Sequence, residues 1–197
     1  MSTLLYFLLS VPAILIATTI HEFTRAAVST ALGDTVPREK GHLTLNPLKH
    51  FEPIGFILMM VNGFGWGKPC PTSSLYYKDR KKGTVLTAVL PNVANLVFAG
   101  VFMVLYGRVV NPYLNLFCML TMHYNVCLLV YNIVPVTPMD CLKVLSVALP
   151  SETYFKYLQY EKVVQMVFLL LLFMGLADTL FLPLIGGVQM GLYALLV

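Results

Sequence analysis

Residues 4–25 read LLYFLLSVPAILIATTIHEFTR, an apolar run that passes without a break into a cluster of charged side chains. Pro12 is the one helix breaker inside the run, and no further breaker follows before Gly33. A helix over residues 4–32 would place His21 about 25 Å from its start, at a rise of about 1.5 Å per residue. That length is close to the thickness of the hydrocarbon core of a bilayer. We therefore expect one membrane-spanning helix that carries His21 and the charges after it near the far face.

The composition agrees with a membrane protein. Of the 197 residues, 58% are hydrophobic and only 11% are charged, and the mean hydropathy is +0.77. An ordinary soluble domain carries about 25% charged residues. A soluble globule of this size could not bury so much apolar surface, so the excess must face lipid. These numbers exclude disordered, collagen-like and disulfide-scaffold proteins, and they leave room for four or five crossings at about 20 residues each.

Three further apolar segments predict spans over residues 84–106, 113–133 and 163–177. The segment 179–197 is expected to be an interfacial or half-crossing helix, with a fifth span as the alternative. Residues 54–67 are apolar for too short a distance to cross and end in glycines, which indicates a re-entrant or interfacial element.

The alternation His42-Leu43-Thr44-Leu45 predicts a short strand pair. The fold class is therefore all-α polytopic transmembrane, with the re-entrant element and a small β element on the cytoplasmic side. We expect a single membrane-embedded domain over 1–197, with a core over about 4–150 and a C-terminal part over 163–197.

The basic residues predict the topology. Nine of the thirteen Lys and Arg residues lie between residues 25 and 82. The positive-inside rule places that stretch in the cytoplasm and the N-terminus outside. The next two spans then bring residues 132–140 back to the cytoplasmic side. His21, Glu22 and Asp140 should thus reach the same membrane depth from different helices.

Ionisable groups inside a membrane are costly unless they are paired or functional. On a helix, residues 21, 22 and 25 lie on one face. This spacing is that of the H-E-x-x-H motif, in which two imidazoles bind zinc and the glutamate acts as general base. Here Arg25 stands in the position of the second histidine.

Several motifs, in one order over about residues 10–150, resemble the site-2 protease family of zinc intramembrane metalloproteases (peptidase family M50). The similarity is greatest to compact members without PDZ or CBS domains. The motifs are HEFTR (21–25), LGD (32–34), GHLTLNPLKH (41–50), PIG (53–55), GWGKP (65–69), NVAN (92–95) and NIVPVTPMD (132–140).

The resemblance implies a zinc cofactor with His21 as first ligand, Asp140 as third ligand and Glu22 as catalytic base. It further implies that the protein cleaves a single-pass transmembrane substrate near the cytoplasmic face of a prokaryotic plasma membrane, and no nucleic acid is expected as a partner. The resemblance gives the contacts with the substrate backbone to Asn95 and Asn132, and it gives the loop beside the site to Gly65, Trp66 and Gly67.

The sequence departs from the family pattern at two site positions. Arg25 replaces the second ligand histidine, and Cys141 replaces the glycine that follows the aspartate. Arginine keeps its proton and has no free lone pair, so it cannot bind zinc. We expect Arg25 to pair with Asp140, Glu22 or both, as a structural pseudo-site. The alternative is a zinc site repaired by another ligand, with Cys141 favoured over His123.

These departures leave three functional hypotheses. In the first, the protein is an inactive or impaired homologue that acts by binding transmembrane segments. In the second, it is an active zinc endopeptidase with a substitute ligand. In the third, it is a small transporter or channel that uses its intramembrane charges. The four cysteines are expected to be reduced, and His42 and His50 are expected to be structural or exposed loop residues.

Overall fold

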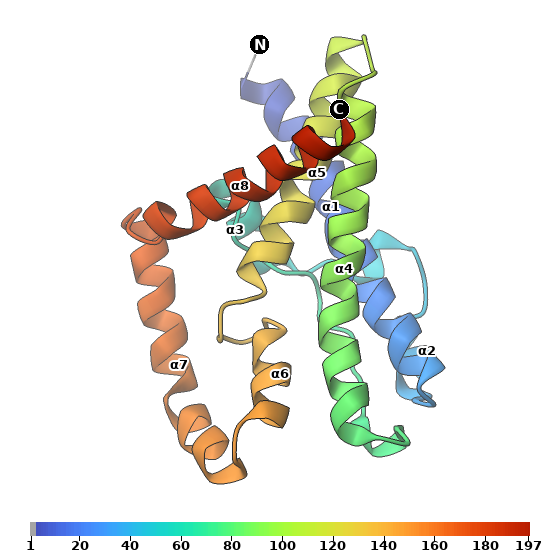
Figure 1. The fold of residues 1–197 in the computed structure, drawn as a ribbon, viewed down its shortest axis with the longest axis vertical. Coiled ribbons are helices and arrows are strands. Elements are labelled where there is room, and N and C mark those ends of the chain that lie inside the picture. Colours follow the sequence, from blue (N-terminus) through green and yellow to red (C-terminus); the bar gives the residue numbers. More distant parts are fainter. Residues whose placement is uncertain (1–2) are drawn as a thin grey trace.

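The structure is a computed structural model that describes residues 3–197, and all its regular elements in that range are helices (Figure 1). The α-helices are α1 (Thr3–Ala31), α2 (Val36–Glu39), α3 (Pro53–Asn62), α4 (Arg80–Tyr106), α5 (Pro112–Tyr131), α6 (Cys141–Ala148), α7 (Ser151–Phe173) and α8 (Asp178–Leu196). Two 3-10 turns, η1 (Pro47–Lys49) and η2 (Ser74–Tyr76), lie in the connections.

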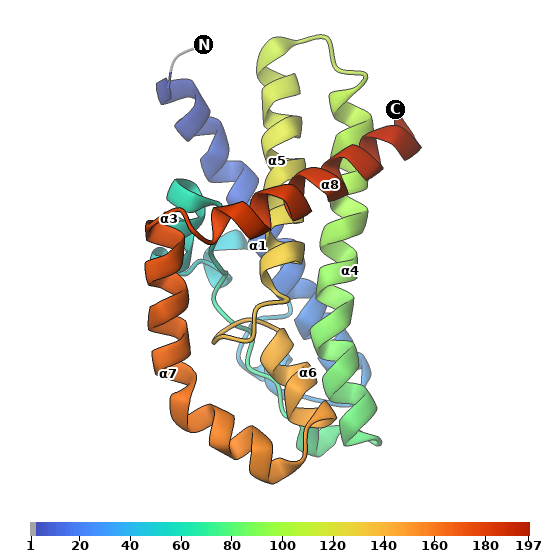
Figure 2. The ribbon, with the colours of Figure 1, turned by 60° about the vertical axis from the view of Figure 1, so that its left-hand side comes forward.

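The core of the molecule is formed by α1, α4 and α5, which pack against one another (Figures 1 and 2). Helix α5 is the most buried of the three, because its apolar residues cover its whole circumference. Helix α4 buries one face and exposes Val89, Val93, Val97 and Val101 on another. A row of exposed valines would be unfavourable in water, and it suits a helix that faces lipid.

Four helices are long and apolar enough to cross a membrane: α1, α4, α5 and α8. The spans predicted over 84–106 and 113–133 correspond to α4 and α5. The fourth span was predicted wrongly over 163–177. Helix α7 starts in polar sequence at Ser151 and ends at Phe173, where Gly175 turns the chain with a φ of 71°. The fourth candidate is α8, which agrees with the alternative of a span over 179–197, and it runs obliquely past α4 and α5 (Figure 2).

Helix α3 is the short apolar element expected in the re-entrant region. It has 10 residues, too few to cross, and the side chain of Glu52 caps its first turn by accepting from the Gly55 N–H. Gly63, with a φ of 72°, ends the helix. The chain then returns past α3 so closely that a side chain at Gly65 would overlap the backbone oxygen of Gly55.

The predicted strand pair is absent: residues 3–197 contain no strand. The backbone groups after His42 find local partners instead. The side chain of Thr44 accepts from the Asn46 N–H, and that of Asn46 accepts from the Leu48 N–H. Such side-chain bonds compete with a strand ladder, and they lead the chain into η1.

Candidate functional site

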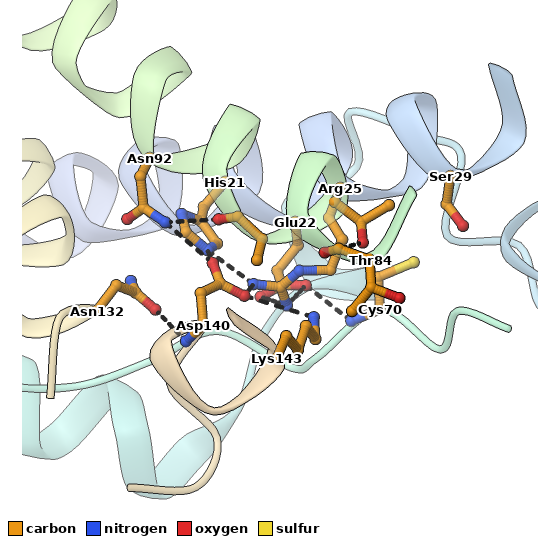
Figure 3. A network of polar contacts seen from close by, with 12 residues as sticks. His21, Glu22, Arg25, Ser29, Cys70, Thr84, Asn92, Asn132, Asp140 and Lys143 are labelled. Atoms are coloured by element: carbon orange, nitrogen blue, oxygen red, sulfur yellow. Dashed lines mark hydrogen bonds and ion pairs between the residues drawn. The ribbon is translucent and has the colours of Figure 1, made fainter. Parts of the chain in front are cut away.

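Four ionisable residues singled out in the sequence meet in the interior of the molecule (Figure 3). His21, Glu22 and Arg25 project from one face of α1, and Asp140 projects from the turn before α6. All four are buried, with exposed fractions of 1–3%. The prediction that Asp140 meets His21 and Glu22 although they come from different segments is therefore confirmed.

Arg25 is at the centre of the cluster. Its Nη2 donates to Asp140 Oδ1 at 2.6 Å and lies 2.9 Å from His21 Nε2. Its Nη1 lies 2.8 Å from both carboxylate oxygens of Glu22. The guanidinium thus bridges both carboxylates and the imidazole, which is the pairing expected from the sequence. Charge-assisted bonds of this kind are among the strongest in proteins.

The charges of the cluster balance. Lys143 Nζ lies 3.4 Å from Asp140 Oδ1, so two cations, Arg25 and Lys143, face two carboxylates, Glu22 and Asp140. Burial, followed by repulsion from Arg25, lowers the pKa of Lys143 to about 8, which still leaves it mostly charged at pH 7. A dication added beside Arg25 would leave positive charge unbalanced in a site shielded from water.

A chain of amides orients His21. His21 Nδ1 lies 2.7 Å from Asn95 Oδ1, and Asn95 Nδ2 donates to Asn125 Oδ1 at 2.8 Å and to the Ala17 carbonyl at 3.2 Å. Because the amide group of Asn95 is already a donor elsewhere, its oxygen accepts from His21 Nδ1–H. His21 Nε2 faces both Arg25 Nη2, at 2.9 Å, and Asp140 Oδ2, at 3.0 Å. Zinc-binding histidines are commonly fixed in the same way by a second hydrogen bond.

Two asparagines position Asp140. The Asp140 N–H donates to Asn132 Oδ1 at 3.0 Å, and Asn92 Nδ2 donates to Asp140 Oδ2 at 3.1 Å. Asn132 also accepts the Cys141 N–H through its carbonyl. The side chains of Asn95 and Asn132 are thus engaged within the protein, and their contact with a substrate stays a prediction.

Glu22 is held from two sides. Besides Arg25, the backbone N–H of Cys70 donates to Glu22 Oε2 at 2.7 Å. Burial, followed by the charge of Glu22, raises the pKa of the Cys70 thiol to about 12. Beside Glu22, a side chain at Gly67 would lie 3.4 Å from Glu22 Cγ, so the loop after α3 packs directly on the cluster.

The space beside Glu22 and Arg25 is small. A cavity of about 10 Å³ lies next to them, and Trp66, Gly67 and Asn132 contribute to its wall. A single water needs roughly 10–15 Å³ of such space, so this cavity has room for at most one water. A separate cavity of about 270 Å³ is lined by Asn92, Asn132 and Asp140. Trp66 and Gly67 lie beside the site as the resemblance implied, while Gly65 packs against α3 instead.

The donor set does not fit a catalytic zinc. Such a site normally has three protein ligands, whereas Arg25 stands between His21 and Asp140 here. Within residues 3–197, no group of three His, Cys, Asp or Glu side chains could hold a metal. Burial raises the pKa of Cys141, which disfavours the thiolate that zinc binds. His123 contacts Cys127 and Gln189 instead of the cluster.

Four participants in the site were missed by sequence reasoning: Asn92, Asn125, Lys143 and Cys70. Lys143 could have been found, because it lies three residues after Asp140 in an apolar helix. Cys70 acts through its backbone N–H, which leaves no signal in the sequence. The two asparagines become part of the site only through packing of α4 and α5 on α1.

Comparison with known proteins finds a relative of this chain. A Bacillus subtilis (strain 168) protein described as "Putative zinc metalloprotease YwhC" is 31% identical over 202 residues, which cover 95% of this chain and 92% of that protein. No family model and no solved structure matches the chain. Four candidate membrane spans and the bacterial relative indicate a multi-pass membrane protein. By this identity over nearly its whole length, the chain belongs to the site-2 protease family.

Proposed function

We propose that this protein is a site-2 protease homologue that does not hydrolyse peptide bonds and acts by binding transmembrane segments. One observation carries the proposal: Arg25 Nη2 is hydrogen-bonded to Asp140 and lies 2.9 Å from His21 Nε2. These are the two positions that the family resemblance gives to zinc. The guanidinium, whose charge cannot be removed by deprotonation, stands where a shared metal would have to stand.

The state of Glu22 supports the same proposal. A general base needs a free oxygen within reach of the water whose proton it takes. Both oxygens of Glu22 accept from Arg25, and one also accepts from the Cys70 N–H. With space for at most one water beside it, Glu22 acts here as an ion-pair partner of Arg25.

The binding role rests on an apolar groove outside the cluster. A cavity of about 480 Å³ lies between the end of α5, the residues that follow it, α7 and α8, and its wall includes Ile133, Pro135 and Leu180. The groove borders the loop that ends at Asp140. An apolar helix from another membrane protein would find there a surface of matching polarity.

A transporter or channel is disfavoured by the pairing of the charges. A polar path needs hydrated or exchangeable groups, whereas Glu22, Arg25 and Asp140 are buried and bonded to one another. The protein is therefore better described as a binding protein than as a transporter or channel. We propose that it lies in the cytoplasmic membrane, with the cluster on the cytoplasmic side.

The proposal is tested by the zinc content of purified protein and of Arg25→His. We expect Arg25→His to bind one more zinc per chain than the wild type, and we expect that additional zinc to be lost in the double variant Arg25→His, His21→Gln. Equal zinc in wild type and Arg25→His, together with a peptide product that a chelator suppresses in the wild type, would contradict the proposal.

Binding is tested separately with a photo-crosslinking residue in the groove. Ile133 lines the groove and is 67% exposed, and Val97 is 58% exposed on α4 outside the groove, which makes it a matched control. We expect adducts with single-pass membrane proteins from position 133 and none above background from position 97. Equal adduct formation at both positions would mean that the groove is ordinary lipid-facing surface.

A further inference from the structure

A second pair of histidines lies outside the Arg25 cluster, in the connection between α2 and α3. His42 follows Gly41, which turns the chain with a φ of 69°, and His50 ends η1. Their exposed fractions are 6% and 0%. The two imidazole rings face each other with centroids 5.8 Å apart. Buried histidines are uncommon in a connecting loop, where most side chains are in contact with solvent.

The hydrogen bonds of His50 fix its tautomer. His50 Nε2 lies 2.8 Å from the carbonyl oxygen of Thr44, so Nε2 carries the proton and donates it. The Nδ1 atom of a neutral ring then presents a lone pair. Among the described residues, neither His50 Nδ1 nor His42 Nδ1 has a hydrogen-bond partner, and both atoms are buried. A buried polar nitrogen without a partner is unfavourable, so both Nδ1 atoms are available to a ligand.

This arrangement has the features of a metal site. Neutral imidazole is a common metal ligand, and a ligating histidine typically donates its other N–H to a carbonyl or carboxylate. With a zinc–nitrogen bond of about 2.0–2.1 Å, each ring centre lies roughly 3.2 Å from the ion. Two rings on one ion can therefore be up to roughly 6.4 Å apart. The observed 5.8 Å falls inside that limit.

The charges near the two histidines have opposite effects on metal binding. The pKa of His42 is lowered chiefly by burial, and then by the neighbouring His50 and Lys68. The His42 ring is therefore neutral at pH 7 and able to bind a metal. Lys68 and Lys49 are exposed cations that oppose a bound ion, and Glu22 is an anion that favours it. Glu22 lies across Gly67, where a side chain would contact both Glu22 Cγ and the His50 carbonyl oxygen.

We propose that His42 and His50 bind a first-row divalent transition-metal ion such as Zn²⁺ through their Nδ1 atoms, with water in the remaining positions. This site does not share a ligand with the Arg25 cluster, and it needs neither His21 nor Asp140. It joins the connection after α2 to the residues before α3.

The proposal is tested on the full chain, freed of metal by a chelator and titrated with Zn²⁺ in detergent or nanodiscs. We expect one zinc per wild-type chain and at least tenfold weaker binding in His42→Gln and in His50→Gln. His21→Gln is the matched control, because it removes a histidine from the Arg25 cluster, and it should leave this zinc in place. Lys68→Gln should tighten binding, since it removes a neighbouring positive charge.

If a variant does not fold, X-ray absorption spectroscopy of the zinc-loaded wild type gives the number of imidazole ligands on the zinc without any substitution. Two imidazole ligands support the proposal, and one or none overturns it. Failure to bind zinc at all would overturn this inference and leave the proposed function intact. Loss of the zinc in His21→Gln, with retention in His42→Gln, would overturn both, because the metal would then lie in the Arg25 cluster.

Discussion

At the scale of single residues, Arg25 dominates the electrostatics of the buried cluster. It brings a permanent cation to the carboxylates of Glu22 and Asp140 and so compensates their charge. These ion pairs tie the stability of the protein to Arg25. Surface ion pairs contribute little, whereas breaking a buried pair leaves an uncompensated charge.

We therefore expect Arg25→Ala to lower the free energy of unfolding by about 3–5 kcal/mol, because Glu22 and Asp140 lose their partner. The measurement is thermal or denaturant unfolding in detergent. Lys156→Ala is the matched control, since Lys156 pairs with Glu152 at the surface and should change stability by less than about 0.5 kcal/mol. Equal effects of the two variants would mean that the cluster is hydrated rather than buried.

A second prediction at this scale concerns Cys70. With a pKa of about 12, roughly one thiol in 10⁴ is a thiolate at pH 8, so we expect no alkylation of Cys70 by iodoacetamide in the folded protein. Cys141 is partly exposed and should react first. Mass spectrometry of folded and unfolded samples measures the labelling, and equal Cys70 rates in both would contradict the prediction.

The raised pKa of Cys70 also links stability to pH. Because folding raises this pKa, the contribution of Cys70 to stability should fall as the pH rises from about 8.5 towards 12.

At the scale of elements, the site depends on how closely the loop after α3 approaches that helix. A Cβ at Gly65 would overlap the Gly55 carbonyl oxygen and lie 2.7 Å from Met59 Cβ. These contacts hold the loop so that Gly67 and Cys70 reach Glu22. The glycines are required by packing, since only a residue without a side chain permits this approach.

Gly65→Ala should therefore destabilise the protein by about 1–3 kcal/mol, because the loop and α3 must separate. The change is measured by unfolding in detergent. Gly186→Ala in α8 is the control, since a side chain at that position would meet no atom within 4 Å. A stabilised or unchanged Gly65→Ala protein would mean that the loop is free to shift, and the contacts with Glu22 would then not depend on this glycine.

At the scale of the whole molecule, the candidate spans and the positive charges together predict an orientation in the membrane. Lys81 lies at the start of α4 among basic residues, and Val110 lies in the connection from α4 to α5 with an exposed fraction of 95%. The positive-inside rule places the first in the cytoplasm and the second outside.

In a background with the natural cysteines replaced, we expect Val110→Cys to react with a membrane-impermeant maleimide in intact cells. Lys81→Cys should react only after the membrane is opened. The reverse pattern would invert the topology and place the Arg25 cluster near the outer face.

The sequence alone determined that the chain is a membrane protein of this family, that the first three spans correspond to α1, α4 and α5, and that Arg25 cannot replace histidine as a zinc ligand. These conclusions rest on composition, on long apolar runs and on the chemistry of one side chain, all of which are local. The errors at the span predicted over 163–177 and at the expected strand pair arose where a glycine turn and side-chain capping outweigh a hydrophobic pattern.

The tertiary structure decided the detailed contacts between distant residues. The sequence predicted that Arg25 pairs with Asp140, Glu22 or both, but no spacing rule indicates that one guanidinium reaches both of them and His21 together. The pairing of His42 with His50, and the contact of the Cys70 N–H with Glu22, also depend on how the connections fold onto α1. Such contacts form only when helices pack, because side-chain direction and backbone hydrogen bonds are set by neighbours that are remote in sequence.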